Sequence, residues 1–272
     1  MPYAGLWCQM NSFFLLTDAL AFRQKTHTHT HTAHYFIHLL TGGVWDLVVY
    51  SPYSPFRKFL KSYKFNPEYP NTGRFFHDLF WSLCSTVISS LFEAWTLRQW
   101  VGGVSLGMPL GAHTHDTWWR DGATLAWLVT MPYWRLGHFF FLHRSMHKWF
   151  PGRQPGTGVI PDIGEQIYNY VHSLHHKAKN PTALSGVAMH PIESSGYYTA
   201  MWIPHAVAAA ARALPAVFPA ALGASIHPIV LLYTKMDLTI AALVGHDGHG
   251  YPGGGSQCHW LHHVSILCVV VA

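Results

Sequence analysis

Four long stretches of this chain are nearly free of charge, and they limit the possible folds more than any other feature. They are 18 to 22 residues long, with Glu93 and Arg135 as their only charged residues. The stretches are Leu79–Leu97, Gly122–Leu142, Ser194–Ala211 and Ala213–Thr234. A helix of this length crosses a hydrocarbon layer of about 30 Å. Charged residues make up 11% of the chain, too few to cover a soluble globule, in which about 25% is usual. We therefore expect an all-α membrane protein with about four transmembrane helices.

The basic residues of the loops predict which ends of these helices face the cytosol. One side is rich in them: Arg57, Lys58, Lys61, Lys64 and Arg74 precede the first stretch, and Arg144, Lys148, Arg153, Lys177 and Lys179 follow the second. The other side has only Arg98, Arg120 and Arg212. The positive-inside rule then places residues 51–74, 143–193 and 235–272 in the cytosol. The net charge of +5 is interpreted as membrane orientation and not as nucleic-acid binding.

The N-terminal part differs in composition from the rest. Residues 1–50 are expected to be a variable segment, and 51–272 the membrane domain. The tract THTHTHT at 26–32 is either a metal-scavenging segment or a translated dinucleotide repeat, and we favour the repeat. The stretch Phe36–Tyr50 is shorter than a span and includes Asp46, which favours a re-entrant or interfacial element. The four cysteines form no CxxC pair, so no zinc ribbon is indicated.

Clusters of histidine lie on the expected cytosolic side. They are HRSMH with His143 and His147, HSLHH with His172, His175 and His176, HWLHH with His259, His262 and His263, and GHDGHG with His246. Positions i, i+3 and i+4 share one face of a helix, so each motif is predicted to direct its imidazoles to one place. Three such helices would offer about eight nitrogen ligands, which suits two metal ions with open positions better than one tetrahedral zinc.

These motifs resemble the fatty acid hydroxylase/sterol desaturase superfamily of integral-membrane di-iron enzymes, from about Trp45 to His263. The resemblance lies in HFFFLHRSMH (138–147), HSLHHKAKNPTALSGVAMHPIE (172–193) and GHDGHGYPGGGSQCHWLHH (245–263). It implies two irons held by boxed histidines. The implied ligands are His143, His147, His172, His175, His176, His246, His259, His262 and His263. His190 and His138 are further candidates, as ligands or as residues that support them.

The resemblance also implies an activity. Family members use O2 to hydroxylate or desaturate a lipid such as a sterol, fatty acid or sphingolipid, and the endoplasmic reticulum is the expected membrane. The electrons are expected from NAD(P)H through cytochrome b5 or a similar donor, because the chain has no flavin, haem or nicotinamide motif. A lipid channel is expected to end at the metals, with Phe139–Phe141, Tyr197, Tyr198 and Trp202 as candidate lining residues.

Three alternatives remain beside this interpretation. Family members usually carry an Asn-aromatic-Gly segment after the last box, whereas this chain reads VSILCVVVA, so an inactive, truncated member is one alternative. A zinc-binding or zinc-transporting membrane protein is the second, and it would need polar ligands at mid-membrane depth. A haem protein using His205 and His227 is the third, and it would leave the boxes unexplained. Glu93 and Arg135 are expected to pair with each other or to lie near an interface.

Overall fold

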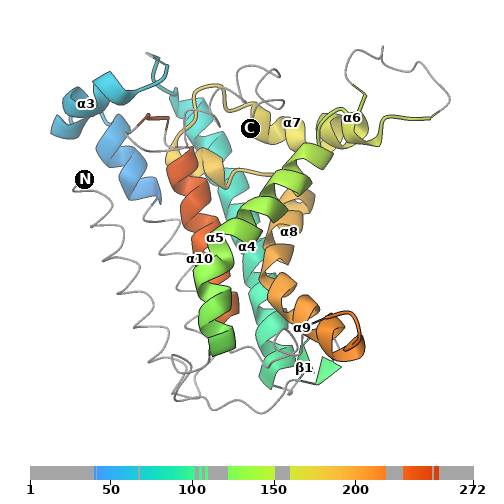
Figure 1. Ribbon diagram of the computed structural model, residues 1–272. Coiled ribbons are helices and arrows are strands. Elements are labelled where there is room, and N and C mark those ends of the chain that lie inside the picture. Colours follow the sequence, from blue (N-terminus) through green and yellow to red (C-terminus); the bar gives the residue numbers. More distant parts are fainter. Residues whose placement is uncertain are drawn as a thin grey trace.

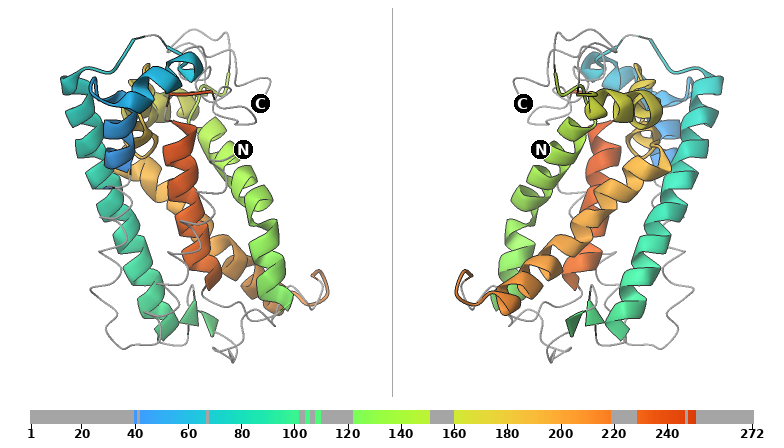
Figure 2. Two further views of the ribbon diagram at one scale, coloured as in Figure 1. Left: turned by 90° about the vertical axis from the view of Figure 1, so that its left-hand side faces the viewer. Right: turned by 90° about the vertical axis from the view of Figure 1, so that its right-hand side faces the viewer.

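In the part of the chain that the structure describes, four helical segments, called passes below, alternate in direction (Figures 1 and 2). The computed structural model describes residues 40, 42–66, 68–101, 104–105, 108–109, 122–150, 160–218, 229–246 and 248–250. This part is mostly helical. The passes are α4 (Thr72–Val101), α5 (Gly122–Ser145), the series α8 (Pro191–Tyr198), η5 (Thr199–Trp202) and α9 (Ile203–Ala213), and α10 (Ile229–Gly245).

Among the described residues, α4 is the one helix that is long and apolar enough to cross a membrane, judged by length and composition alone. Its apolar part, Thr72–Thr96, has 25 residues, and only 22% of its most apolar window is buried within the molecule. A core helix of a soluble protein would be mostly buried. The first predicted stretch lies within α4, and the second lies within α5.

The fourth predicted stretch, Ala213–Thr234, is wrong as a single helix. Helix α9 ends at Ala213, a turn follows at 215–217, and the next described helix, α10, spans Ile229–Gly245. Pro215 explains the break, because a proline disfavours helical backbone at the residue before it, and Leu214 has φ −127° and ψ 61°. Helix α10 also extends beyond residue 234, where the predicted stretch ended. It therefore includes two charged residues, Lys235 and Asp237.

These two charges also correct the expected pairing of Glu93 with Arg135. Lys235 forms an ion pair with Glu93 of α4, and Asp237 forms one with Arg135 of α5. Both side chains of the Glu93–Lys235 pair are about 5% exposed or less. Buried charges are costly without a partner, so the two pairs fix α10 against its neighbours on both sides.

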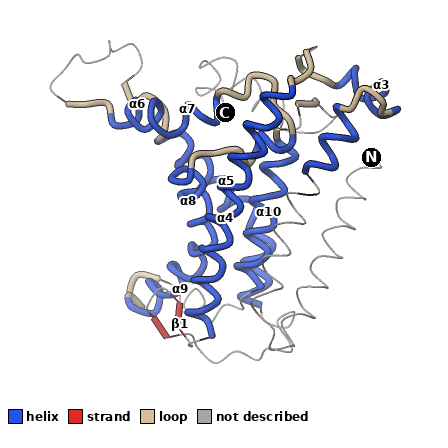
Figure 3. Tube along the Cα trace, turned by 180° about the vertical axis from the view of Figure 1, so that it is seen from behind, coloured by secondary structure: helices blue, strands red, loops and turns tan. Residues whose placement is uncertain are grey.

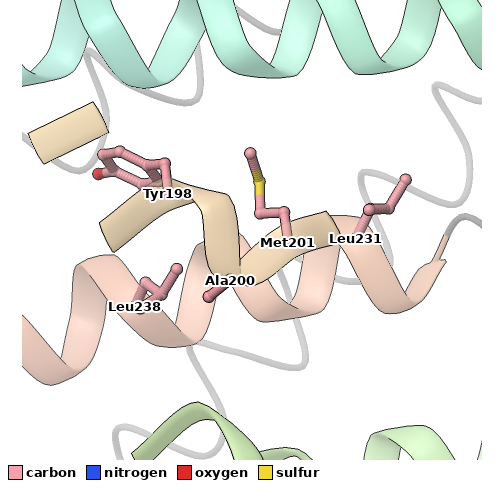
Figure 4. Close-up of a cluster of buried hydrophobic side chains, with 5 residues drawn as sticks. All are labelled: Tyr198, Ala200, Met201, Leu231 and Leu238. Carbon is pink, nitrogen blue, oxygen red and sulfur yellow. The ribbon is translucent and has the colours of Figure 1, made fainter. Parts of the chain in front are cut away.

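A small apolar core lies between the third and fourth passes. Its buried residues are Tyr198, Ala200, Met201, Leu231 and Leu238 (Figure 4). Ala200 is completely buried, and its small side chain lets the two backbones approach closely. Pro204 stands in the first turn of α9, where its missing N–H is not needed.

Short elements gather at one end of the passes, where α4 begins and α5 and α10 end (Figures 1 and 3). They are α3 (Pro55–Leu60), η1 (Lys61–Tyr63), α6 (Ile163–Ile167), the π-helix η3 (Tyr168–His172), α7 (Ser173–His176) and η4 (Ala183–Gly186). The opposite end has the two-residue strands β1 (Val104–Ser105) and β2 (Met108–Pro109), which pair antiparallel with Val104 opposite Pro109.

Within the predicted re-entrant stretch Phe36–Tyr50, residues 42–50 are helical and lie at the first of these ends. Asp46 fixes this helix to η4, because its carboxylate accepts hydrogen bonds from the backbone N–H groups of Ala183 (2.7 Å) and Leu184 (3.1 Å). Burial raises the pKa of Asp46 to about 7. The tract at 26–32 lies outside the described residues.

Candidate metal centre

Four histidines from two distant parts of the chain meet at the end of the bundle. His143 lies in the last turn of α5 and His147 just after it, while His172 ends η3 and His176 ends α7. One ring nitrogen of each lies within 4.8 Å of the others. Neighbouring Nε2 atoms are 3.3 Å apart in His143–His147, 3.1 Å in His147–His172 and 2.9 Å in His172–His176. This four-histidine cluster can hold a metal ion.

Local backbone geometry brings the first two rings together. After α5 the chain tightens, since the N–H of Met146 bonds to the carbonyl of His143 and the N–H of His147 bonds to that of Arg144. The rings of His172 and His176 come together through the π-turn of η3, because this wider turn changes the direction of the side chains that follow it. Short π segments of this kind are frequent at functional sites.

The second motif does not direct all its imidazoles to one place, which corrects the prediction. His172 and His176, four residues apart, face the four-histidine cluster. His175 lies with its Nε2 3.1 Å from Nε2 of His246, at the end of α10. The second box therefore contributes to two groups, the four-histidine cluster and the His175–His246 pair. The third box, with His259, His262 and His263, lies outside the described residues.

Oxygen acceptors hold the Nδ1 side of several of these rings. Glu193 Oε1 lies 2.7 Å from Nδ1 of His172, and the carbonyl of Ala242 lies 2.7 Å from Nδ1 of His246. A ring that donates its Nδ1 proton keeps a lone pair on Nε2. Tyr197 OH lies 2.9 Å from Nδ1 of His143. Outer partners of this kind are what orient histidine ligands of metals.

The resulting arrangement of lone pairs is informative. Nε2 of His172 and Nε2 of His246 each face the Nε2 of another imidazole at about 3 Å. Two lone pairs at this distance repel unless a proton or a cation lies between them. Ligands on a tetrahedral ion with bonds of about 2.1 Å are roughly 3.4 Å apart, close to the nitrogen separations observed here. The donor set therefore fits a metal ion.

The cluster and its outer partners are buried. Glu193 is fully buried beside His172. His143, His147 and His172 are all at most 8% exposed. Sequence reasoning missed Glu193, although it ends the segment 172–193 that carries the family resemblance. It named Tyr197 only as a candidate lining residue of the channel and not as a partner of His143.

Asp162 joins the two segments that carry the cluster. Its carboxylate accepts from the N–H groups of Trp149, Phe150 and Glu165, at 2.9 to 3.0 Å, and caps α6. Burial alone would raise the pKa of Asp162, but these three donors lower it overall. The spacing D-x-x-E in the sequence is a helix-start signal that could have located this cap.

Two further candidates lie outside the four-histidine cluster. His138 is bonded through Nε2 to Thr199 Oγ1, at 3.0 Å. His190 caps α8, where its Nδ1 accepts from the N–H of Ile192 at 3.2 Å. Both rings therefore have structural partners.

An apolar cavity of about 230 Å³ lies between α5, α8 and α10, and His175 and His246 are among the residues that line it. Its walls include Arg135, Phe139 and Tyr197. Of the described residues that line it, none belongs to the four-histidine cluster, and Tyr197 connects the two through its bond to His143. Tyr198 also lines the cavity, whereas the predicted Phe141 is 73% exposed and Trp202 stacks on Phe92 at 4.9 Å.

The chain matches no family model, no curated protein and no solved structure.

Proposed function

We propose that this protein is an integral-membrane, iron-dependent oxidoreductase that uses O2 to hydroxylate or desaturate a membrane lipid, as the resemblance to the fatty acid hydroxylase/sterol desaturase superfamily implies. The observation that carries the proposal is the four-histidine cluster beside an apolar cavity whose lining includes a second pair of histidines. A protein that merely stores a metal has no need of an apolar cavity at the metal ligands.

The ligands divide into two groups in this proposal. His143, His147, His172 and His176 hold one iron, while His175 and His246, together with His259, His262 and His263 of the third box, hold the other. When bound, the irons supply the O2 activation needed to oxidise an unactivated C–H bond. Electrons come from NAD(P)H through cytochrome b5 or a similar donor.

The chain's own residues prepare the site for this chemistry. Glu193 and Tyr197 fix the rings of His172 and His143 with Nε2 toward the cluster. Phe139 lines the cavity and stacks on both His143 and Tyr197, so it links the cavity wall to the four-histidine cluster. Ala241 and Ala242 of α10 form a small, apolar wall against which a hydrocarbon can lie, and this wall excludes water from the reacting carbon.

Exposed apolar side chains support a membrane location with four transmembrane passes. On α4 they follow one face as Phe76, Phe80, Leu83, Val87, Leu91 and Trp95, each at least 38% exposed. At 1.5 Å per residue this face is about 28 Å long, close to the hydrocarbon thickness of about 30 Å. A second face on α5 includes Val129, Tyr133 and Leu136, which are 73%, 79% and 58% exposed. Lys148, Lys177 and Lys179 lie at the histidine end, which favours a site on the cytosolic face. The endoplasmic reticulum is the membrane that the family resemblance implies.

Metal analysis of the detergent-purified chain, with an optical spectrum, tests the proposal. Two irons per chain without a haem Soret band are expected, and O2 consumption should require a lipid. His172→Ala should lose iron from the four-histidine cluster, whereas His190→Asn, which keeps a helix-capping side chain, should retain it. Stoichiometric haem, or equal iron in both variants, would contradict the proposal.

Zinc binding is the second candidate function, because four imidazole nitrogens also suit tetrahedral zinc. It predicts one zinc per chain, lost in His172→Ala, and no O2 consumption with any lipid. An inactive family member predicts iron in the cluster without turnover. The metal content and the O2 measurement together separate these outcomes.

A further inference from the structure

A short helix beside the start of α4 exposes aromatic rings that contribute nothing to the core. Tyr53, Phe56 and Phe59, in and just before α3, are 94%, 51% and 56% exposed, whereas Leu60 at the end of the helix is buried at 5%. Phe56 and Phe59 are three residues apart and so lie on one face. Adjacent exposed aromatic rings on a short helix are typical of a surface that binds an apolar partner or a membrane.

The same segment is strongly basic. Arg57, Lys58, Lys61 and Lys64 fall within eight residues, and there is no acidic residue between 51 and 66. Arg57 and Lys64 are engaged within the molecule: the guanidinium lies 3.7 Å from the ring centre of Tyr69, and Lys64 Nζ donates to Asn180 Oδ1 at 2.8 Å. Lys58 and Lys61 are exposed and do not take part in these contacts.

The position of this segment is fixed relative to the long helices. Backbone hydrogen bonds join Phe65 N–H to the carbonyl of Gly248 (3.1 Å) and Gly250 N–H to that of Tyr63 (2.6 Å). In both views, α3 lies at the end where α4 begins (Figures 1 and 2). The exposed apolar face of α4 starts at that end with Phe76, which is 60% exposed. The aromatic rings and lysines of α3 are therefore held at the level where that apolar face begins.

We propose that α3 and η1 rest on a surface of anionic phospholipid. Phe56 and Phe59 enter the boundary between headgroups and acyl chains, and Lys58 and Lys61 bind the anionic headgroups. Aromatic residues on one face and lysines on another are the pattern of helices that lie in a membrane interface. Basic residues next to a transmembrane helix favour anionic lipid. The proposal goes beyond the proposed oxidase function and requires no metal.

Photocrosslinking of the full-length chain in lipid nanodiscs tests it. One preparation contains phosphatidylserine with a photoreactive acyl chain, and the other contains the matching phosphatidylcholine in the same amount. Mass spectrometry then measures lipid adducts on the peptide that covers residues 53–63. We expect about tenfold more adducts with phosphatidylserine, because each lysine near the surface adds attraction to anionic lipid. Lys58→Gln/Lys61→Gln should abolish this preference.

The matched control is Lys177→Gln/Lys179→Gln, which removes two exposed lysines outside α3 and should leave the preference unchanged. Equal labelling by both lipids in the unaltered chain would overturn the proposal. Labelling of Phe76 and Phe80 on α4 with no labelling of α3 would overturn it as well. In that case the aromatic face of α3 would not contact lipid and would be open to a soluble partner. Absence of bound iron would contradict the oxidase function but would leave this measurement unaffected.

Discussion

At the scale of single residues, the outer partners of the histidines determine what the candidate site can bind. An imidazole can offer either nitrogen, and the oxygen bonded to Nδ1 selects Nε2. In His172 the selecting group is the carboxylate of Glu193, and in His246 it is the carbonyl of Ala242. The side-chain partner can be altered by mutation without removing a ligand, so it gives the more direct test.

Glu193→Gln is expected to lower the affinity of the four-histidine cluster for its metal about 10- to 100-fold, the usual cost of losing an outer partner. The amide has nearly the same shape as the carboxylate but orients and polarises His172 less strongly. Titration of the metal-free chain with Fe²⁺ or Zn²⁺ measures the change. Glu165→Gln, in a partly exposed pair with Lys148, is the control, and equal affinities in the two variants would refute the role of Glu193.

Gly186 is a second residue whose size matters. A Cβ added there would lie 2.0 Å from the carbonyl oxygen of Ala242 and 2.9 Å from Nδ1 of His246. Gly186→Ala should therefore displace α10 from η4 and cost about 1–3 kcal/mol of unfolding free energy. In α5, a Cβ at Gly137 would meet nothing within 4 Å, so Gly137→Ala should be neutral or stabilising. Thermal unfolding in detergent compares them, and equal melting temperatures would contradict the close packing.

At the scale of elements, buried acids connect the short helices at the histidine end. Asp46 binds the start of η4, and Asp78 accepts from Ser185 Oγ in the same turn, at 2.5 Å. Ser82 of α4 donates to the carbonyl of Leu184. The turn η4 is thus fixed from two sides, and the missing side chain of Gly186 at its end leaves room for His246.

The raised pKa of Asp46 predicts a pH dependence of stability. A carboxyl that holds its proton more tightly when folded stabilises the fold below the unfolded pKa of about 4. This contribution is lost as pH rises through the folded pKa of about 7. We expect Asp46→Asn to flatten the fall in melting temperature between pH 4 and 7. Parallel curves for the variant and the unaltered chain would show that Asp46 does not titrate in this range.

At the scale of the whole molecule, the exposed apolar faces of α4 and α5 lie on helices that also frame the cavity and the four-histidine cluster. Leu91 lies toward the far end of the α4 face and is 61% exposed. In water an exposed leucine can become lysine at a cost within about 0.5 kcal/mol. At the centre of a membrane helix a lysine costs about 2.5–3.5 kcal/mol. The cost is smaller toward the helix end but still exceeds the cost in water, so one substitution distinguishes the two environments.

Leu91→Lys is accordingly expected to reduce the membrane-inserted fraction of the chain, measured by alkaline extraction of membranes. Ile160→Lys is the matched control, because Ile160 is 65% exposed but lies outside the long helices. It should insert normally. Normal insertion of Leu91→Lys would contradict the assignment of the α4 face to lipid.

The sequence by itself determined the local features. The low charge of residues 79–97 and 122–142 predicted two helices that the structure contains within α4 and α5, because a long apolar stretch needs its backbone hydrogen bonds satisfied internally. The four-residue spacing of His143 with His147 and of His172 with His176 predicted that each pair shares a face, because helical periodicity is a local property.

Only the tertiary structure decided which partners these residues meet. It separated His175 from His172 and His176, paired Glu93 with Lys235 and not with Arg135, and placed Glu193 and Tyr197 behind the rings. The chain breaks after α9, and α10 spans Ile229–Gly245 where the prediction had Ala213–Thr234. The spacing of residues along a helix fixes the direction in which their side chains point around its axis. The partners that they meet on other helices depend on how each helix is rotated, on its position along the bundle and on the π-turn of η3. Packing of the whole bundle sets these quantities, which is why no local pattern contained them.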